Sequence, residues 1–436
     1  MRFLLVLWVL FILYGSFIPF RFTADTGTLR ENLAHVRWSL FKDGRRAFSI
    51  PDVVSNVLLF VPLGVLAVGA RGTSGPSVAP TVVGAVALAA VLAAGIEVGQ
   101  LFAPGRVSSI SDLIANTTGA LLGAGAAARV LRPIEGRLGV WGQRLVRQTP
   151  EVLPLVVLVA DQLASSFYPF QATLDVGTVW TTLKHAQRVP FASLATASWT
   201  DQLVEQVLPF ALMALLVFRA LGRRRSTAPR RSAWLLVASL AVALEVGKLV
   251  VVGRRPNVDN ALLGGLGALV GVTVLPAFVG SRPVRARPAA WLLALALLFL
   301  VHTELTPYDW RMTPAWVAAK IRGIEWLPLA AYFRARPERA LFDLWEKLVR
   351  SGFLGFAAAS MAGRAGIVPW VVGAATGTLL EAAQLVTATR VPSVTDVLTI
   401  TLGAHAGGAA WQWFGRWRAA PAGERRLPVP PTVRHH

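Results

Sequence analysis

The sequence predicts an all-α membrane protein of about 12 transmembrane helices, built as three parallel repeats of a four-helix unit with a short interfacial helix in each. Two observations predict this fold class. Long apolar segments recur along the whole chain, and one pattern of polar residues occurs three times at fixed spacing.

The composition is that of a membrane protein. Of the 436 residues, 54% are hydrophobic and 15% are charged, whereas soluble globular chains carry about 25% charged residues. A bilayer core about 30 Å thick requires about 20 mainly apolar residues per helix. Segments of this kind predict spans at residues 3–20, 52–70, 80–103, 109–131, 152–170, 201–221, 232–252, 258–279, 289–306, 343–362, 366–388 and 394–415.

The formal net charge of +20 comes from basic residues scattered between these spans. They are not interleaved with aromatic residues in one soluble domain, so the pattern predicts contact with anionic membrane lipid and no nucleic-acid partner. The chain has no cysteine, which excludes disulfides and thiolate metal sites. No metal site and no cofactor are predicted.

Short basic connections set the expected orientation. Arginines follow the sixth span at residues 223–225 and 230–231, and others follow the fourth and eighth spans. By the positive-inside bias these connections are cytoplasmic, as are both termini. The segment 21–51, expected outside, is an exception because it carries Arg30 and Lys42. The preference for arginine over lysine, with much alanine, valine and glycine, indicates a GC-rich bacterial genome, and we expect the protein in the bacterial cytoplasmic membrane.

Three glutamates, Glu97, Glu245 and Glu381, mark the repeats. A polar residue follows each after three positions, an arginine after nine, an aspartate or asparagine after fifteen, and glycines after 22 and 26. Upstream, a proline–aromatic pair ends the first span of each repeat and an aspartate opens the second. The repeats are assigned to residues 1–135, 136–280 and 281–436. Because four spans is an even number, successive repeats have the same orientation, unlike the inverted repeats of many transporters.

The spacing places the polar groups of one repeat at one membrane surface. Residues three or four apart share a helix face, and the start of one span, the end of the next and the start of the one after lie at the same surface. The candidate binding residues of the first repeat are Asp52, Asn56, Glu97, Gln100, Arg106, Asp112 and Asn116. Their counterparts are Asp201, Glu205, Glu245, Lys248, Arg254 and Asn260 in the second repeat, and Asp343, Lys347, Glu381, Gln384, Arg390 and Asp396 in the third.

Two interpretations of this cluster remain open. In the structural one, Glu97 and Asp112 neutralise Arg106 and fix the turn between spans three and four, while Gly119 and Gly123 let helices approach closely. In the functional one, the cluster binds an anionic head group or a cation, or performs acid–base chemistry. The convergence of so many polar groups near hydrocarbon favours function for the cluster as a whole.

The motif resembles that of the VanZ-like family, small bacterial four-span proteins. The resemblance rests on Asp52-x3-Asn56, Phe60-x-Pro62-x-Gly64, Glu97-x2-Gln100 and Arg106-x5-Asp112-x3-Asn116-x2-Gly119. The first repeat carries the motif in full. The later repeats replace Asn56 by Glu205 and Lys347, Gln100 by Lys248, and Asp112 by Asn260, which puts a shared chemistry in doubt. The family is named for a protein associated with teicoplanin resistance, so the resemblance implies a role at the cell envelope and no particular reaction.

Three classes of function follow. The first is a non-enzymatic envelope or drug-tolerance protein that binds lipid-linked cell-wall precursors, the second is a membrane enzyme acting on such lipids, and the third is a transporter. No histidine accompanies Ser55 or Ser111 at corresponding positions, which argues against a serine hydrolase. Parallel repeats with polar groups at one surface argue against a transporter. Asp161, in mid-span, is a candidate proton-handling residue or a helix contact beside Gln162.

Overall fold

The computed structural model describes residues 2–17, 20, 22–23, 25–38, 42–43, 46–47, 50–70, 79–104, 107–131, 142, 145, 147–173, 175–192, 198–224 and 226–419. The chain forms two compact units, Met1–Trp141 and Gly142–His436. The first boundary lies close to the predicted end of the first repeat. The second predicted boundary, at 280/281, falls inside the C-terminal unit.

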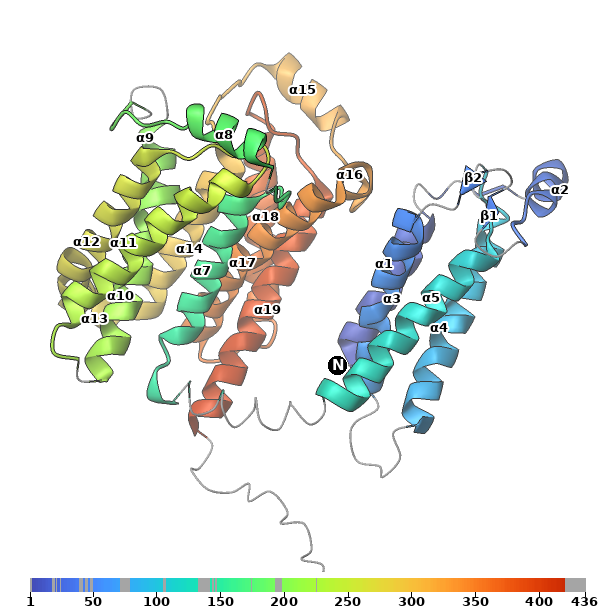
Figure 1. Cartoon of the computed structure of the whole chain (residues 1–436), viewed down its shortest axis with the longest axis horizontal. Coiled ribbons are helices and arrows are strands. Elements are labelled where there is room, and N and C mark those ends of the chain that lie inside the picture. The colour runs from blue at the N-terminus through green and yellow to red at the C-terminus, as the bar shows by residue number, and fades with distance from the viewer. Residues whose placement is uncertain are drawn as a thin grey trace, which may run out of the picture. The chain divides into compact units, whose positions relative to one another are not determined.

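The N-terminal unit is a bundle of apolar helices (Figure 1). Its elements are α1 (Arg2–Phe17), α2 (Thr26–Ala34), β1 (Lys42–Asp43), β2 (Arg46–Ala47), α3 (Ile50–Ala70), α4 (Ala79–Gln100), α5 (Ile110–Ala126) and the π-helical η1 (Ala127–Leu131). The two short strands pair antiparallel, with Lys42 opposite Ala47. Helices α3 and α5 form the main contact, and Ile12, Phe60 and Leu63 are buried in the core between α1, α3, α4 and α5.

The C-terminal unit contains two further sets of four long helices, with short helices lying across their ends (Figure 1). The first set comprises α7 (Val152–Phe167), α8 (Val176–Lys184), α9 (Trp199–Asp201), η3 (Gln202–Val207), α10 (Leu208–Arg223), α11 (Pro229–Gly247), η4 (Lys248–Val250) and α12 (Val258–Gly280). The second comprises α13 (Arg282–Ala286), α14 (Pro288–Leu305), α15 (Pro314–Arg322), α16 (Ala330–Arg334), α17 (Pro337–Ala362), α18 (Val368–Gln384) and α19 (Val394–Ala419). Helices of both sets touch where α7 meets α17.

The helices agree with the predicted spans to within a few residues. Five of them are long and apolar enough to cross a bilayer by length and composition: Ala79–Gln100, Trp199–Arg223, Pro229–Val250, Val258–Gly280 and Pro288–Leu305. Many large apolar side chains lie on the surface, among them Val91 at 73% and Leu379 at 70% exposure. Water disfavours such exposure and lipid favours it, so the structure is that of a multi-pass membrane protein.

Glycines allow pairs of helices to pack with their backbones in contact, as the sequence predicted. A Cβ atom added to Gly123 on α5 would lie 2.0 Å from the carbonyl oxygen of Val61 on α3, and one added to Gly271 on α12 would lie 2.2 Å from that of Ala211 on α10. The equivalent Gly407 on α19 would meet the carbonyl oxygen of Gly352 at 1.8 Å.

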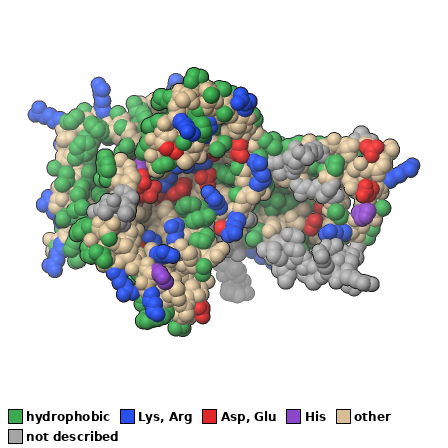
Figure 2. All heavy atoms as spheres, turned by 90° about the horizontal axis from the view of Figure 1, so that it is seen from above, with side chains coloured by type: hydrophobic (Ala, Val, Ile, Leu, Met, Phe, Trp, Pro, Cys, Tyr) green, Lys and Arg blue, Asp and Glu red, His purple; other side chains and the backbone are tan. Residues whose placement is uncertain are grey.

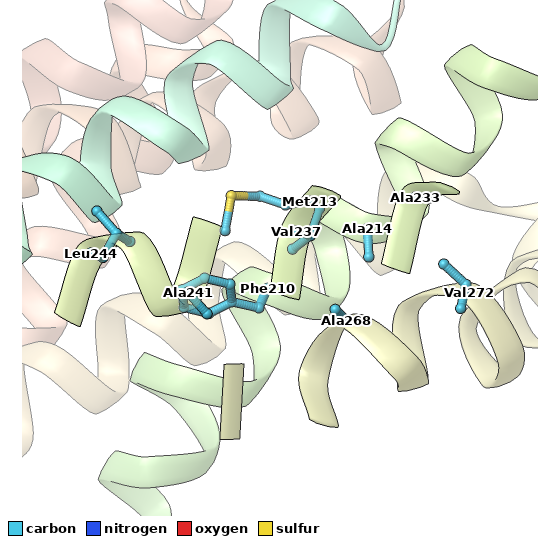
Figure 3. Close-up of a cluster of buried hydrophobic side chains, with 9 residues drawn as sticks. All are labelled: Phe210, Met213, Ala214, Ala233, Val237, Ala241, Leu244, Ala268 and Val272. Atoms are coloured by element: carbon cyan, nitrogen blue, oxygen red, sulfur yellow. The ribbon is translucent and has the colours of Figure 1, made fainter. Parts of the chain in front are cut away.

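Helix α11 packs against both α10 and α12. Their core consists of alanines around Phe210, Met213 and Val237, with Leu244 and Val272 toward its two ends (Figure 3). Ala214, Ala233 and Ala268 are fully buried. Because these small side chains leave little space between the helices, the polar ends of α10, α11 and α12 are held at fixed separations.

One loop arrangement recurs in each of the three sequence segments. After the first helix, the chain runs back along the turn between the third and fourth helices. The backbone N–H of Thr23 donates to Phe102 O at 2.8 Å, that of Thr173 to Val250 O at 2.8 Å, and that of Arg311 to Val386 O at 2.7 Å. A parallel bridge then joins the segment after the short helix to the start of the fourth helix at Arg37–Ser109, Gln187–Asn257 and Glu325–Ser393.

The short helices α2, α8 and α15 start at side-chain caps. Asp25 and Asp175 accept the backbone N–H groups of Thr28 and Thr178, and Thr313 accepts that of Trp316. Hydrogen bonds from Thr178 lower the pKa of Asp175, which is fully exposed. Val176 is 80% exposed and Trp180 56%, as expected for an amphipathic helix in the membrane interface.

Candidate functional site

The motif residues of the N-terminal unit meet where α4 ends and α5 begins. The Oε2 atom of Glu97 accepts the backbone N–H of Ser109 at 2.7 Å, and its backbone carbonyl accepts the hydroxyl of Ser108 at 2.7 Å. The Nδ2 atom of Asn56 on α3 donates to Asp112 Oδ1 at 2.9 Å. Three helix ends are thus tied together by polar side chains.

The other candidate residues of this unit are only partly described. Asn116 is buried on α5, and its Oδ1 has no hydrogen-bond partner among the described residues. Gln100 is the last residue of α4 and is half-buried. The side chain of Asp52 on α3, and Arg106 as a whole, lie outside the described residues. The proposed pairing of Arg106 with Glu97 and Asp112 therefore stays a prediction.

The second cluster repeats the backbone contact of the first and has a lysine, Lys248, where the first has Gln100. The Oε2 atom of Glu245 accepts the backbone N–H of Asn257 at 2.9 Å, as Glu97 does from Ser109. Its Oε1 accepts Lys248 Nζ at 2.6 Å and Asn260 Nδ2 at 3.1 Å. Both members of the Glu245–Lys248 ion pair are nearly buried, each with 11% of its side chain exposed.

The third cluster has a nearly buried lysine, Lys347, at its centre. Lys347 Nζ on α17 lies 2.9 Å from Asp343 Oδ2 and 2.7 Å from Asp396 Oδ1. On α18, Glu381 Oε2 accepts the backbone N–H of Ser393 at 2.6 Å. Lys347 thus stands where Asn56 stands in the N-terminal unit, and it contacts the aspartate equivalent to Asp112.

An additional carboxylate joins this third cluster. Glu304 at the end of α14, Glu381 and Asp396 each have an oxygen within 4.8 Å of the other two. Three such oxygens resemble part of a site for a hard cation. Here, however, the ammonium of Lys347 contacts Asp396, and Gln384 Nε2 lies 3.4 Å from Glu304 Oε2 and 3.4 Å from Glu381 Oε1. Lys347 and Gln384 therefore already provide positive charge and hydrogen-bond donors to these oxygens.

The motif arginines of the C-terminal unit bind backbone carbonyls. Arg254 donates from Nη2 to Ser165 O at 2.6 Å and from Nε to Tyr168 O, at the end of α7. Arg390 donates to Thr303 O and Thr306 O, each at 2.7 Å, at the end of α14. These carbonyls have no partner within their helix. Burial lowers the pKa of Arg254, against the opposing effects of Tyr168 and Glu245.

A polar cavity of about 200 Å³ lies among helices of both sets in the C-terminal unit. Its wall includes three acidic residues, Asp161, Glu205 and Glu346. Basic and other polar residues complete it, namely Lys248, Arg254, Arg350, Asn260, Gln162, Gln206, Ser165, Ser166 and Thr303. Seen from the end of the bundle where α8 and α15 lie, acidic side chains gather near the middle of the unit with basic ones around them (Figure 2).

Charges in the cavity are unequally compensated. Arg350 Nη2 donates to Glu346 Oε1 at 2.8 Å, and Lys248 is paired with Glu245. Asp161 accepts a side-chain hydrogen bond from Trp345, but its buried Oδ1 has no partner among the residues that the structure describes. Glu205 has an exposed side chain on the cavity wall and no ion pair among the described residues. Two carboxylates thus remain open to a ligand.

Comparison with known proteins finds a family match for the N-terminal unit. Residues 1–132 match the VanZ/LLP1 family model. The N-terminal unit is a VanZ-family unit. No curated protein and no solved structure matches the chain. The matched residues contain the cluster of Glu97, Asn56 and Asp112. The second and third clusters, in the C-terminal unit, are therefore compared with this one.

The structure brings most of the predicted residues together and adds others. In the C-terminal unit, Asp201 Oδ1 lies 3.3 Å from the buried Nε2 of His302 on α14 and so joins the two sets of helices. The VanZ motif has no residue equivalent to Glu304, Glu346 or Arg350, so comparing the repeats did not identify these three as site residues. They could have been identified as ionisable residues within predicted membrane spans.

Proposed function

We propose that this is a three-repeat VanZ-like protein of the bacterial cytoplasmic membrane that binds phosphate-bearing lipid head groups, including those of lipid-linked cell-wall precursors, at the extracytoplasmic surface. Such binding would give it a role in the cell envelope and in tolerance to glycopeptides of the teicoplanin type. The proposal extends the VanZ family membership of residues 1–132 to the whole chain.

Recurring contacts support the three-repeat arrangement. In each segment the motif glutamate accepts the same backbone N–H group, from Ser109, Asn257 or Ser393. The parallel bridge next to this bond also recurs. Three separate segments adopt the same unusual loop, which is expected of duplicated units and not of unrelated helical hairpins.

The observation that carries the binding proposal is the polar cavity with Lys248 and Arg254 on its wall. Arg254 lies in the turn before α12 and holds the end of α7, so its guanidinium lies at the membrane surface where head groups are. Arginine and lysine are the usual ligands of phosphate groups. Exposed Val176, Trp180 and Trp199 belong to the elements at this end of the bundle, which supports an interfacial depth for the cavity.

The test is a thermal-unfolding series on the full chain in detergent, with native mass spectrometry to detect retained lipid. We expect phosphatidylglycerol or a polyprenyl phosphate to raise the melting temperature, and diacylglycerol of the same chain length to leave it unchanged. Arg254→Gln is expected to lose most of this lipid-dependent rise, measured from its own lipid-free value.

Arg255→Gln is the matched control, because Arg255 is the exposed neighbour of Arg254 and loses the same charge. It should keep the lipid-dependent rise. If no phosphate-bearing lipid stabilises the wild-type protein and none is retained in the mass spectrometer, the proposal is wrong.

A further inference from the structure

The open carboxylates of the C-terminal cavity require a partner that donates hydrogen bonds. Asp161 Oδ1 is buried without a hydrogen-bond partner in the described part of the chain, and Glu205, exposed on the cavity wall, makes no ion pair with a described residue. Burying an unpaired carboxylate oxygen such as that of Asp161 is costly. An anionic group at this place would instead face Asp161 and Glu205, with Glu346 already paired to Arg350, so this wall disfavours an anion.

Positive charge lies at the other end of the cavity. Arg254 donates to the carbonyl of Ser165, which is four residues beyond Asp161 on α7. At 1.5 Å per residue, Asp161 therefore lies about 6 Å deeper along the helix than the contact made by Arg254. The cavity thus presents Arg254 near the end of α7 and the Asp161 carboxylate below it, while Arg350, also on the wall, is paired with Glu346.

We infer that this cavity holds a head group that combines a phosphate with a primary ammonium, as in phosphatidylethanolamine, with the ammonium directed to Asp161 and Glu205. This inference rests on the proposed binding of phosphate-bearing lipids and specifies their chemistry in the C-terminal unit. The phosphate lies toward Arg254 and Lys248, and the short O–C–C–N chain spans the distance to the carboxylates.

The order of charges fits a lipid and argues against other cations. The ammonium is the end of the head group farthest from the acyl chains, so it enters first and reaches the deepest wall. A primary ammonium has three N–H donors, which match the unpaired carboxylate oxygens. A bare metal ion carries no anionic group to pair with Arg254, which also lines the cavity.

The experiment compares four additives on the full chain in detergent: phosphatidylethanolamine, phosphatidylcholine and phosphatidylglycerol with identical chains, and free O-phosphoethanolamine. Phosphatidylethanolamine is expected to raise the melting temperature most. Phosphatidylcholine carries the same charges but its ammonium has no N–H group, and phosphatidylglycerol has no amine. An equal rise with O-phosphoethanolamine would identify a soluble phosphorylated amine as the source of the same head-group chemistry.

Two independent variants locate the effect. Asp161→Asn and Glu205→Gln should each weaken the apparent affinity for phosphatidylethanolamine about tenfold or more, since each removes a charge-assisted hydrogen bond. Glu31→Gln, an exposed residue of α2 in the N-terminal unit, is the control and should leave it unchanged. If one cavity variant does not fold, the other still decides.

The outcomes separate this inference from the proposed function. Equal stabilisation by phosphatidylglycerol and phosphatidylethanolamine would overturn the inference and leave the proposed function intact. Retention of the full phosphatidylethanolamine effect in both cavity variants would also overturn it. No stabilisation by any of the four additives, with none by a polyprenyl phosphate, would overturn both.

Discussion

The carboxylate of Glu245 pairs with the ammonium of Lys248 at 2.6 Å, one helical turn along the chain. The equivalent position holds Gln100 in the N-terminal unit and Gln384 in the third cluster. The same backbone bond to the glutamate is kept in all three places. The glutamate therefore has a constant role in fixing the turn before the fourth helix, and the residue three positions later is variable.

This relationship predicts an asymmetry between the two members of the pair. Glu245→Gln leaves a shielded ammonium without its counter-charge, and such a loss typically costs about 3 to 5 kcal/mol. Lys248→Gln recreates the Glu–Gln combination of the other two clusters, and we expect it to cost about 1 kcal/mol. Chemical or thermal unfolding in detergent measures both. A larger loss from Lys248→Gln than from Glu245→Gln would show that the lysine, and not the glutamate, fixes the turn.

Two glycines on α5 provide a matched test of helix packing. Gly123→Ala places a Cβ atom 2.0 Å from the carbonyl oxygen of Val61, so α3 and α5 must separate. Overpacking of this kind costs about 1 to 3 kcal/mol. Gly125 has no atom of the described residues within 4 Å of the added Cβ, and Gly125→Ala should be neutral or slightly stabilising because alanine favours the helix. Equal effects on the unfolding temperature would mean that α3 and α5 are not in close contact.

The sequence predicted the helices and the close contacts but only part of the candidate site. The helix positions could be predicted because a helix that crosses a bilayer needs an apolar segment of about 20 residues. Gly123 and Gly271 could be identified because their spacing repeats. Fixed offsets also identified Glu97, Glu245 and Glu381, whose bonds are local to one helical hairpin.

Contacts between segments far apart in the chain were beyond such reasoning. Offsets placed Arg254 and Arg390 near the carboxylates, whereas they donate to carbonyls 84 to 89 residues away, at the ends of α7 and α14. The cavity brings Asp161, Glu205 and Arg350 together from three helices. Nothing in a single sequence reports which faces of separate helices meet, so Asp161 could be noticed as a mid-span carboxylate but not connected with Glu205 and Arg350.

The two carbonyl contacts of Arg390 lead to a prediction about arginine specifically. Its Nε and Nη2 atoms reach Thr306 O and Thr303 O together. A lysine ammonium lacks this planar fork, so Arg390→Lys should lose at least one of the two bonds and cost about 1.5 to 3 kcal/mol. Unfolding in detergent measures the loss. Arg364→Lys, at an exposed arginine between α17 and α18, is the control, and similar effects of the two changes would exclude a specific contribution from the fork.

The orientation of the C-terminal unit can be tested with introduced cysteines, because the chain has none. Thr227 lies in the basic connection between α10 and α11, and Met312, 70% exposed, lies between α14 and α15. The basic connection follows the C-terminal end of α10 but precedes the N-terminal end of α14. Thr227 lies in a basic connection, and Met312 follows the end of α14 that is far from one. The two positions therefore belong to opposite membrane surfaces. The positive-inside bias places Thr227 in the cytoplasm. In intact cells an impermeant maleimide should therefore label Met312→Cys and leave Thr227→Cys unlabelled until the membrane is permeabilised.

The reverse pattern would place the polar clusters and the cavity at the cytoplasmic surface, where lipid-linked cell-wall precursors are assembled and not consumed. Labelling of both in intact cells would contradict the assignment of α10 and α14 as membrane spans.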